Sequence, residues 1–232
     1  LVLNLESSTG SGKTRVTPFI FAIRSLIGKL SQPFIFMIQP RYSIISEKIQ
    51  DLKNILGDSV HLASNQTEFE KFYGKKLEKP VVALFTPRTM IKILVNANNI
   101  KYQLIKKSRF ILDEVHERSI DTDVLIALLA KEMKTSKIIM QLLMMTATPD
   151  DRLFKSFDNI NNISLPNACL FKIDDRKQTV NNFGELDNTV TESTMSIIQE
   201  MVDKKIDPGH ILIFTSGNRR INNIMNNISA SI

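Results

Sequence analysis

The stretch that decides the fold is Ser7-Ser8-Thr9-Gly10-Ser11-Gly12-Lys13-Thr14. The apolar run Val2–Leu5 precedes it and is expected to form a buried strand, and the apolar segment Thr17–Leu30 follows it and is expected to form a helix. A glycine-rich turn between a strand and a helix can direct backbone N–H groups and the positive end of the helix dipole at a phosphate group. The stretch therefore predicts a triphosphate-binding loop.

The loop supplies the candidates for nucleotide binding, which are Thr9, Gly10, Ser11, Gly12, Lys13 and Thr14. Lys13 is expected to reach the β- and γ-phosphates, and Thr14 is expected to place its hydroxyl on Mg²⁺. The strict pattern for such loops has a glycine where Ser7 stands. The alternative is an ordinary Gly/Ser-rich turn with a solvated lysine, which the strand–turn–helix context disfavours.

An acidic pair, Asp113-Glu114, directly follows a second apolar run, Arg109–Leu112. Open α/β sheets bind their ligands at the carboxyl ends of the strands, so both carboxylates are expected beside the phosphate loop. Asp113 is a candidate Mg²⁺ ligand, and Glu114 is a candidate base for the attacking water; with Lys13 they form the expected catalytic set. Taken alone, the pair could be the solvated start of a helix, because acidic residues favour first turns.

The motifs resemble, in their order, those of superfamily 2 helicases of the DExH type, and the resemblance covers nearly the whole chain. The matching segments are residues 7–14 (motif I), Gln39-Pro40-Arg41 (motif Ia), Thr86-Pro87-Arg88 (motif Ib), Asp113-Glu114-Val115-His116-Glu117-Arg118 (motif II), Thr146-Ala147-Thr148 (motif III) and Pro208-Gly209-His210-Ile211-Leu212-Ile213-Phe214 (first strand of the second motor domain). The tail after motif III, from Pro149-Asp150-Asp151-Arg152 to Leu170-Phe171-Lys172-Ile173, looks most like poxvirus-type nucleoside triphosphate phosphohydrolase II, which suggests a viral origin.

The resemblance implies ATP-driven movement along nucleic acid, usually single-stranded RNA, with strand separation. ATP, with loose choice among nucleoside triphosphates, and Mg²⁺ are the implied cofactors. The implied coupling residues are His116, Thr146 and Thr148, and the implied contacts to the nucleic-acid backbone are Arg41, Thr86 and Arg88. Each also has a simpler explanation: a histidine that packs or caps a helix, threonines at a strand end, or solvated arginines.

Apolar strand-like runs alternate with helical stretches, which predicts a parallel α/β sheet. The resemblance implies that this sheet is RecA-like, with helices on both faces. The expected strands are Val2–Leu5, Phe34–Ile38, Val81–Phe85, Phe110–Leu112, Ile138–Met145 and Ile211–Phe214. The expected helices are Thr14–Gly28, Ser43–Leu56, Arg88–Asn96, Asp121–Met133, Asp150–Phe157 and Glu192–Lys204. Gly57 is expected to end the second helix as a C-cap, and Asp121-Thr122-Asp123 to open the fourth.

The segment from Asn159 to Asn188 is rich in asparagine and low in helical periodicity, so the domain junction is expected there. Residues 1–173 are expected to form the ATP-binding domain, and residues 174–232 the truncated start of a second RecA-like domain. The chain begins at Leu1 without an initiator methionine, which suggests a fragment with low activity alone. The resemblance implies that the rest of the second motor domain, expected beyond this chain, supplies an arginine finger, which is typically worth about 10³–10⁵ in rate.

The net charge of +6 and the pI of about 9.4 favour polyanionic partners without proving them. Cys169 is the only cysteine, which excludes a disulfide framework and a cysteine-based zinc site. No apolar run long enough to cross a membrane and no leader sequence is present, so a soluble, cytoplasmic protein is expected.

The favoured function is therefore an ATP-dependent RNA helicase, an NTP-hydrolysing enzyme. One alternative is a different motor on the same fold, such as a DNA translocase or a protein-export ATPase, because the fold does not determine which polymer the motor moves. The other is a module that binds nucleotide and RNA without turnover. RNA is favoured over DNA only because of the resemblance; the motifs themselves do not distinguish the two polymers.

Overall fold

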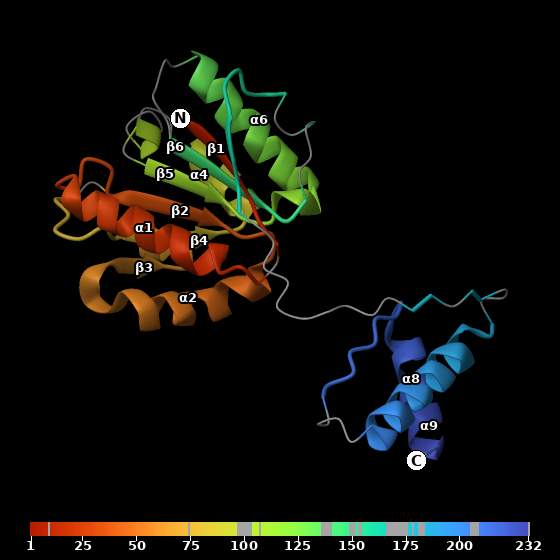
Figure 1. The fold of residues 1–232 in the computed structure, drawn as a ribbon. Helices are drawn as coiled ribbons and strands as arrows, with labels where there is room; N and C mark the ends of the chain where they lie inside the picture. The colour runs from red at the N-terminus through yellow and green to blue at the C-terminus, as the bar shows by residue number, and fades with distance from the viewer. Residues whose placement is uncertain are drawn as a thin grey trace. The chain divides into compact units, whose positions relative to one another are not determined.

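The computed structural model describes residues 1–8, 10–73, 75–96, 104–106, 108–135, 141–148, 152, 155–165, 176–177, 179–180, 184–204 and 209–231. The chain divides into two compact units, Leu1–Leu170 and Phe171–Ile232. The first unit holds a parallel sheet and the second holds a pair of helices (Figure 1).

The sheet of the first unit has seven strands in the order β3-β4-β2-β5-β6-β1-β7, and every pair is parallel. The strands are β1 (Val2–Glu6), β2 (Phe34–Ile38), β3 (His61–Ala63), β4 (Val81–Phe85), β5 (Ser108–Leu112), β6 (Gln141–Thr146) and β7 (Asn161–Ser164). The strands β2, β4 and β5 are buried along their whole length, as expected for parallel strands covered on both faces. Their side chains are apolar at nearly every position for that reason.

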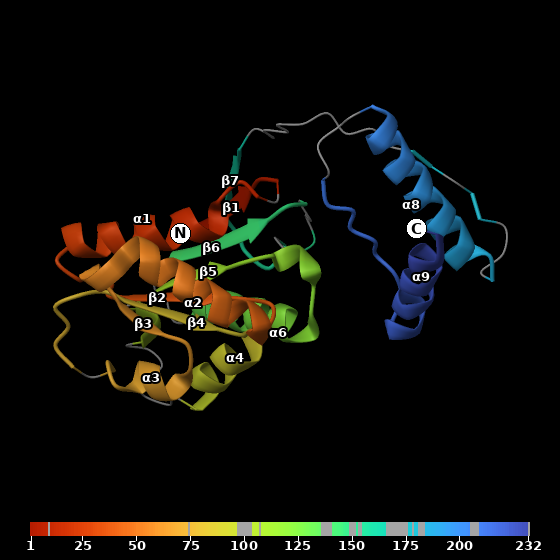
Figure 2. The same cartoon turned by 90° about the horizontal axis from the view of Figure 1, so that it is seen from below.

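Helices cover both faces of the sheet (Figure 2). One face packs against α1 (Lys13–Ile27) and α2 (Tyr42–Leu56), through Ala22, Ile45 and Leu52 on the helices and Ile35, Met37 and Leu84 on the strands. The other face packs against α3 (Gln66–Glu70), α4 (Pro87–Asn96) and α6 (Ile120–Thr135), where Phe36, Phe85 and Phe110 pack with Phe69, Met90 and Leu125. The described residues also include two short 3-10 helices, η1 (Gly57–Ser59) and η2 (Val115–Glu117). This arrangement confirms the predicted RecA-like α/β fold.

Most of the expected elements of the first unit are confirmed with nearly the same bounds. Gly57 ends α2 with φ 51°, and Asp121 and Asp123 lie in the first turn of α6. The edge strands β3 and β7 were missed, because β3 is only three residues long and β7 is exposed and rich in asparagine. Half of the expected helix Asp150–Phe157 falls outside the described residues, and Lys155 and Ser156 form a turn.

The second unit contains α8 (Leu186–Asp203) and α9 (Asn218–Ser231), which contact one another. The helix expected from Glu192 begins earlier, at Leu186, because this contact outweighs the weak helix propensity of asparagine and threonine. The predicted strand Ile211–Phe214 is wrong. Its residues form no regular structure, and Leu212 and Phe214 are 76% and 88% exposed. A strand needs a neighbour to pair its backbone groups, and the described residues of this unit form no other strand.

None of the helices among the described residues is both long enough and apolar enough to cross a membrane.

Candidate nucleotide-binding site

The phosphate loop joins β1 to α1 and turns on two glycines in the left-handed region, Gly10 with φ 80° and Gly12 with φ 83°. Residues with a Cβ rarely adopt such angles, which explains the glycines at these two positions. Ser7 is not among the residues with positive φ. A side chain therefore costs little backbone strain where the strict pattern has glycine. Thr9, also expected to bind nucleotide, lies outside the described residues.

The ammonium group of Lys13 is folded into the loop. Lys13 is 7% exposed, and its Nζ donates hydrogen bonds to the backbone oxygens of Ser7 at 2.5 Å and Ser8 at 2.9 Å. The side chain of Ser11 lies further away, with its Oγ 3.5 Å from Nζ. The loop thus satisfies a buried cation with carbonyl oxygens, groups that phosphate oxygens can replace.

Thr14 and Asp113 meet at the carboxyl edge of the sheet. The Thr14 hydroxyl donates to Oδ2 of Asp113 at 2.9 Å, and the side-chain amide of Gln39 donates to the same oxygen at 3.1 Å. Oδ1 accepts a bond of 3.1 Å from the backbone N–H of Glu114. Asp113 is 5% exposed, so these bonds stabilise a nearly buried carboxylate.

A hydroxyl and a carboxylate at this distance form an oxygen-donor pair of the kind that Mg²⁺ prefers. No group of three or more His, Cys, Asp and Glu side chains suited to a metal occurs in the part of the chain that the structure describes. Mg²⁺ commonly takes one or two carboxylates together with phosphates and water. The donor set therefore fits the expected ion.

Glu114 has a strained backbone and a carboxylate held next to other charges. Its φ of 50° and ψ of 43° are left-handed, which costs about 1–2 kcal/mol for a residue with a side chain. Burial raises the pKa of Glu114, and the neighbouring charge of Asp113 raises it further, while His116 and Lys13 act in the opposite direction. Its Oε2 is buried without a hydrogen bond, 3.4 Å from Nδ1 of His116. A carboxylate with a raised pKa and a free lone pair suits proton abstraction.

The imidazole of His116 lies between the carboxylate of Glu114 and the end of β6. Its Nδ1 is 3.4 Å from the hydroxyl of Thr146 and 3.4 Å from the backbone N–H of Ala147. Thr146 is fully buried, and its hydroxyl donates to the backbone oxygen of Thr148 at 2.6 Å. The backbone N–H of Ser7 donates to the backbone oxygen of Thr146 at 3.2 Å. The phosphate loop, the acidic motif and the segment after β6 are thus linked to one another.

The phosphate loop and the acidic pair Asp113-Glu114 border a cavity of about 520 Å³. Its lining comprises Gly10, Ser11, Gly12, Lys13, Thr14, Arg15, Gln39, Ile44, Glu47, Lys48, Asp113 and Glu114. The sequence indicated neither Gln39 as a site residue nor the three side chains from α2. An amphipathic helix directly after Gln39-Pro40-Arg41 was the available signal, but only the packing of α2 beside α1 shows which of its side chains reach the cavity.

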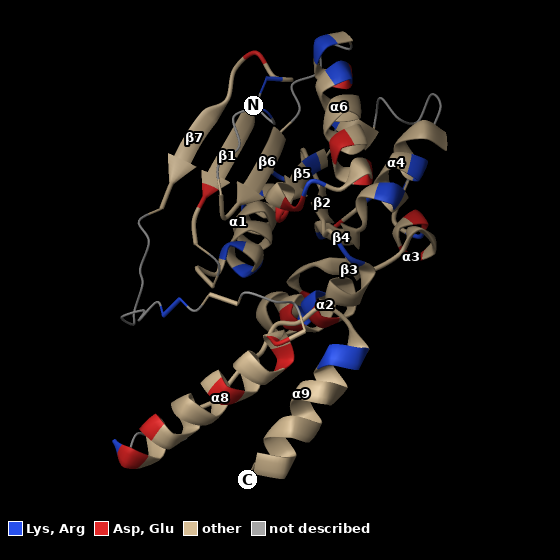
Figure 3. Cartoon of the chain, turned by 90° about the vertical axis from the view of Figure 1, so that its right-hand side faces the viewer, with Lys and Arg blue, Asp and Glu red and all other residues tan. Residues whose placement is uncertain are grey.

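The three expected nucleic-acid contacts follow β2 and β4 at the same edge of the sheet, because Ile38 is paired with Phe85. Arg41 lies 3.3 Å from Glu117 in an exposed ion pair. Thr86 caps α4, since its hydroxyl accepts from the backbone N–H of Thr89 at 3.3 Å. Arg88 is exposed on α4, and Figure 3 colours the Lys and Arg positions of this helix blue. The structure brings these residues to one edge, although it gives Thr86 a helix-capping contact.

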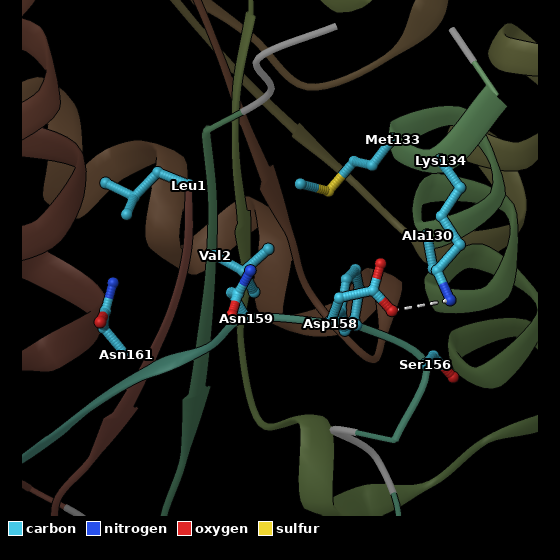
Figure 4. A pocket seen from close by; sticks show the side chains of 10 residues that line it. Leu1, Val2, Ala130, Met133, Lys134, Ser156, Asp158, Asn159 and Asn161 are labelled. Carbon is cyan, nitrogen blue, oxygen red and sulfur yellow. Dashed lines mark ion pairs between the residues drawn. The ribbon is translucent and has the colours of Figure 1, made fainter. Parts of the chain in front are cut away.

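A second cavity of about 290 Å³ lies between the starts of β1 and β7 and the helix α6 (Figure 4). Its charged lining residues, Lys134 and Asp158, form an ion pair of 3.3 Å. Both charges are therefore satisfied within the chain. This cavity contains neither the phosphate loop nor the acidic motif.

A parallel α/β sheet with a phosphate loop and an acidic pair at its carboxyl edge defines a P-loop nucleotide-binding domain. The model of the DEAD/DEAH box helicase family matches residues 2–156, and the chain belongs to that family.

Three curated relatives are similar over most of the chain. The probable ATP-dependent RNA helicase DHR1 of Saccharomyces cerevisiae is 26% identical over 97% of the chain and 18% of its own length. The probable ATP-dependent RNA helicase DHX40 of Homo sapiens is 27% identical over 93% of the chain and 27% of its own length. The ATP-dependent RNA helicase HrpA of Borreliella burgdorferi is 27% identical over 95% of the chain and 25% of its own length. The chain thus spans about a quarter of these relatives or less.

Solved structures give the same fold. The E. coli DExH-box NTPase HrpB superposes with a TM-score of 0.71 at 19% identity, covering 100% of this chain and 26% of that one. S. cerevisiae Dbp5 superposes with a TM-score of 0.58 at 16% identity, covering 99% of this chain and 55% of that one.

Proposed function

We propose that this chain is the ATP-binding part of an ATP-dependent RNA helicase, which hydrolyses nucleoside triphosphate to move along RNA and unwind it. The observation that carries the proposal is the hydrogen bond of 2.9 Å between Thr14 and Asp113 beside the buried Lys13, in one cavity. Family membership and the relatives named as RNA helicases support the same function. ATP is the expected nucleotide, with other nucleoside triphosphates also accepted.

In this proposal Lys13 exchanges its carbonyl partners for the β- and γ-phosphates, and the backbone N–H groups of residues 10–14 bind the remaining phosphate oxygens. Thr14 and Asp113 hold Mg²⁺, which neutralises phosphate charge when it is bound. Glu114 accepts a proton from the attacking water, for which its raised pKa and unbonded Oε2 are suited.

The proposed coupling route runs through His116, Thr146 and Thr148. His116 Nδ1 lies 3.4 Å from both Oε2 of Glu114 and the hydroxyl of Thr146. A change at Glu114 during hydrolysis can therefore alter the contact of His116 with the end of β6. Arg41 and Arg88 are the proposed contacts to RNA phosphates, which makes binding sensitive to salt and largely independent of sequence.

Further assignments extend the proposal. We infer an ATP-binding domain over residues 1–173 and the start of a second RecA-like domain over residues 174–232, supported by the division into two compact units near this point. Four further statements stay predictions. They are the similarity of the tail after β6 to poxvirus-type nucleoside triphosphate phosphohydrolase II, a viral origin, a cytoplasmic location and low activity of the chain alone. Much of that tail lies outside the described residues.

The deciding experiment is a titration of the chain with a fluorescent ADP analogue and, separately, with labelled single-stranded RNA. Lys13→Ala is expected to weaken nucleotide binding on the order of 100-fold, because it removes a charged hydrogen-bond donor to phosphate. RNA binding without nucleotide should stay unchanged. Lys53→Ala, on the exposed surface of α2, is the matched control. Nucleotide affinity equal in Lys13→Ala and the unaltered chain would contradict the proposal.

The alternative motors differ from an RNA helicase in the polymer that they move along. A DNA translocase would show ATP hydrolysis stimulated more by single-stranded DNA than by RNA of the same sequence. A module without turnover would bind both ligands and release no phosphate even with RNA present.

A further inference from the structure

Gln39 is a buried polar side chain of the cavity to which the proposed mechanism gives no role. It is 1% exposed, yet it lines the cavity that holds the phosphate loop. Its side-chain amide donates a hydrogen bond of 3.1 Å to Oδ2 of Asp113. We propose that Gln39 is a positioning residue, which holds the Asp113 carboxylate in the orientation that binds Mg²⁺. This inference rests on the proposed function.

The sheet fixes where Gln39 stands. Ile38 is paired with Leu112 on one side and with Phe85 on the other, so Gln39 is the next residue after a fully paired strand. Its backbone N–H continues the ladder by donating to the oxygen of Phe85 at 2.9 Å, and that of Asp113 donates to the oxygen of Ile38 at 3.0 Å. Gln39 and Asp113 are thus neighbours directly after the ends of two adjacent parallel strands. Their separation is set by backbone pairing and not by a flexible loop.

Both oxygens of Asp113 are occupied by donors within the protein. Oδ1 accepts from the backbone N–H of Glu114 at 3.1 Å, and Oδ2 accepts from Thr14 and Gln39. Among these donors, Thr14 is itself expected to contact the ion. Gln39 also donates to Oδ2, but it is not expected to contact the ion. It therefore restrains the carboxylate without being a metal ligand itself. Groups that orient a ligand in this way tune metal affinity.

The chemistry of the amide suits this task. A lysine or arginine at position 39 would form an ion pair with Asp113 and compete with a divalent cation for its charge. A neutral amide donates a hydrogen bond to the carboxylate and leaves its full negative charge available. An apolar side chain would leave Oδ2 with a single donor in a nearly buried position.

The test is the Mg²⁺ dependence of nucleotide binding by the whole chain, measured with a fluorescent ADP analogue in EDTA and over a series of Mg²⁺ concentrations. Gln39→Met keeps the approximate volume and removes the donor. We expect its Mg²⁺ concentration for half-maximal effect to rise about 10–100-fold, the usual consequence of losing a group that orients a metal ligand. Affinity in EDTA should stay within about twofold of the unaltered chain, because no phosphate contact is removed.

Gln50→Met makes the same substitution on the exposed surface of α2 and is the control. Gln39→Asn keeps the amide but is one methylene too short, and it should shift the Mg²⁺ requirement in the same direction; it replaces Gln39→Met if the latter does not fold.

The outcomes separate this inference from the proposed function. An unchanged Mg²⁺ requirement in the Gln39 variants overturns the positioning role and leaves the proposed function intact. Equal weakening in EDTA and in Mg²⁺ also overturns it, because that result indicates a general disturbance of the cavity. If the unaltered chain binds no nucleotide under either condition, the proposed function itself is overturned.

Discussion

The hydroxyl of Thr14 donates a hydrogen bond of 2.9 Å to the carboxylate of Asp113, although 99 positions of sequence separate the two residues. Thr14 stands at the start of the helix after β1, and Asp113 directly follows β5. The strand β6 lies between β1 and β5, so both residues emerge at the same edge of one sheet. The parallel direction of all these strands is what makes the contact possible.

Glu114→Gln is expected to stabilise the chain at neutral pH. Burial and Asp113 raise the pKa of Glu114 above its ordinary value of 4.5, so the ionised carboxylate is less stable in the folded chain than in the unfolded chain. The destabilisation is present above the folded pKa and disappears as the pH falls below the unfolded value. Urea unfolding of both chains at several pH values tests this: the advantage of the variant should shrink on acidification. A variant less stable at pH 7 than the unaltered chain contradicts the prediction.

Ser7→Ala is expected to keep both stability and nucleotide binding. The hydroxyl of Ser7 is buried without a hydrogen-bond partner, so its loss removes an unsatisfied polar group. Gly12→Ala is the contrasting substitution: an added Cβ would lie 3.9 Å from Val16 Cγ2, which is not a clash, but φ is +83°. Backbone strain of about 1–2 kcal/mol should follow. Thermal unfolding and nucleotide titration of both variants measure the difference, and equal loss in the two would refute this account of the loop.

Arg109→Met is expected to lower the free energy of unfolding by about 2–4 kcal/mol, because it removes a nearly buried guanidinium together with the hydrogen bonds that it donates. Arg109 is 5% exposed and donates to the oxygen of Gln32 at 3.0 Å and to Oε1 of Gln141 at 2.7 Å, and it also donates to the hydroxyl of Ser25. It therefore ties β5 to β6 and to the end of α1. Urea unfolding measures the loss.

Arg24→Met is the matched control for Arg109, since Arg24 is exposed on α1. The two positive charges interact unfavourably: burial first, and then Arg24, lower the pKa of Arg109. Removing Arg24 should therefore cost little stability. A comparable loss in both variants would show that the buried bonds of Arg109 are not the cause.

Glu117→Gln is expected to strengthen the binding of single-stranded RNA about 2–5-fold at low salt, because the exposed ion pair with Arg41 is worth only about 0.2–1 kcal/mol. Arg41 would then be free to contact a phosphate. The gain should shrink as salt is added, since salt screens exposed charges. Fluorescence anisotropy with labelled RNA at two salt concentrations measures it. Glu78→Gln, exposed and outside the site, controls for the change in net charge; an equal gain there would exclude a specific role of the Arg41–Glu117 pair.

Local sequence was enough for the elements that present the site. The phosphate loop has glycine only where the backbone turns left-handed, at Gly10 and Gly12, and its flanking strand and helix were confirmed. The fully apolar runs of β2 and β4 identified buried parallel strands. These features follow from backbone sterics and hydrophobic burial, which act over a few neighbouring residues and so leave a readable pattern.

Only the tertiary structure decided which distant side chains meet. The bond of Gln39 to Asp113, the side chains of α2 beside the phosphate loop and the pairing of Arg41 with Glu117 all depend on strand order and helix packing. The apolar run Ile211–Phe214 shows the same limit from the other side, since it has the composition of a strand and forms none among the described residues of its unit. A strand forms only where a neighbouring strand completes its backbone hydrogen bonds, and the local sequence does not specify which strand that is.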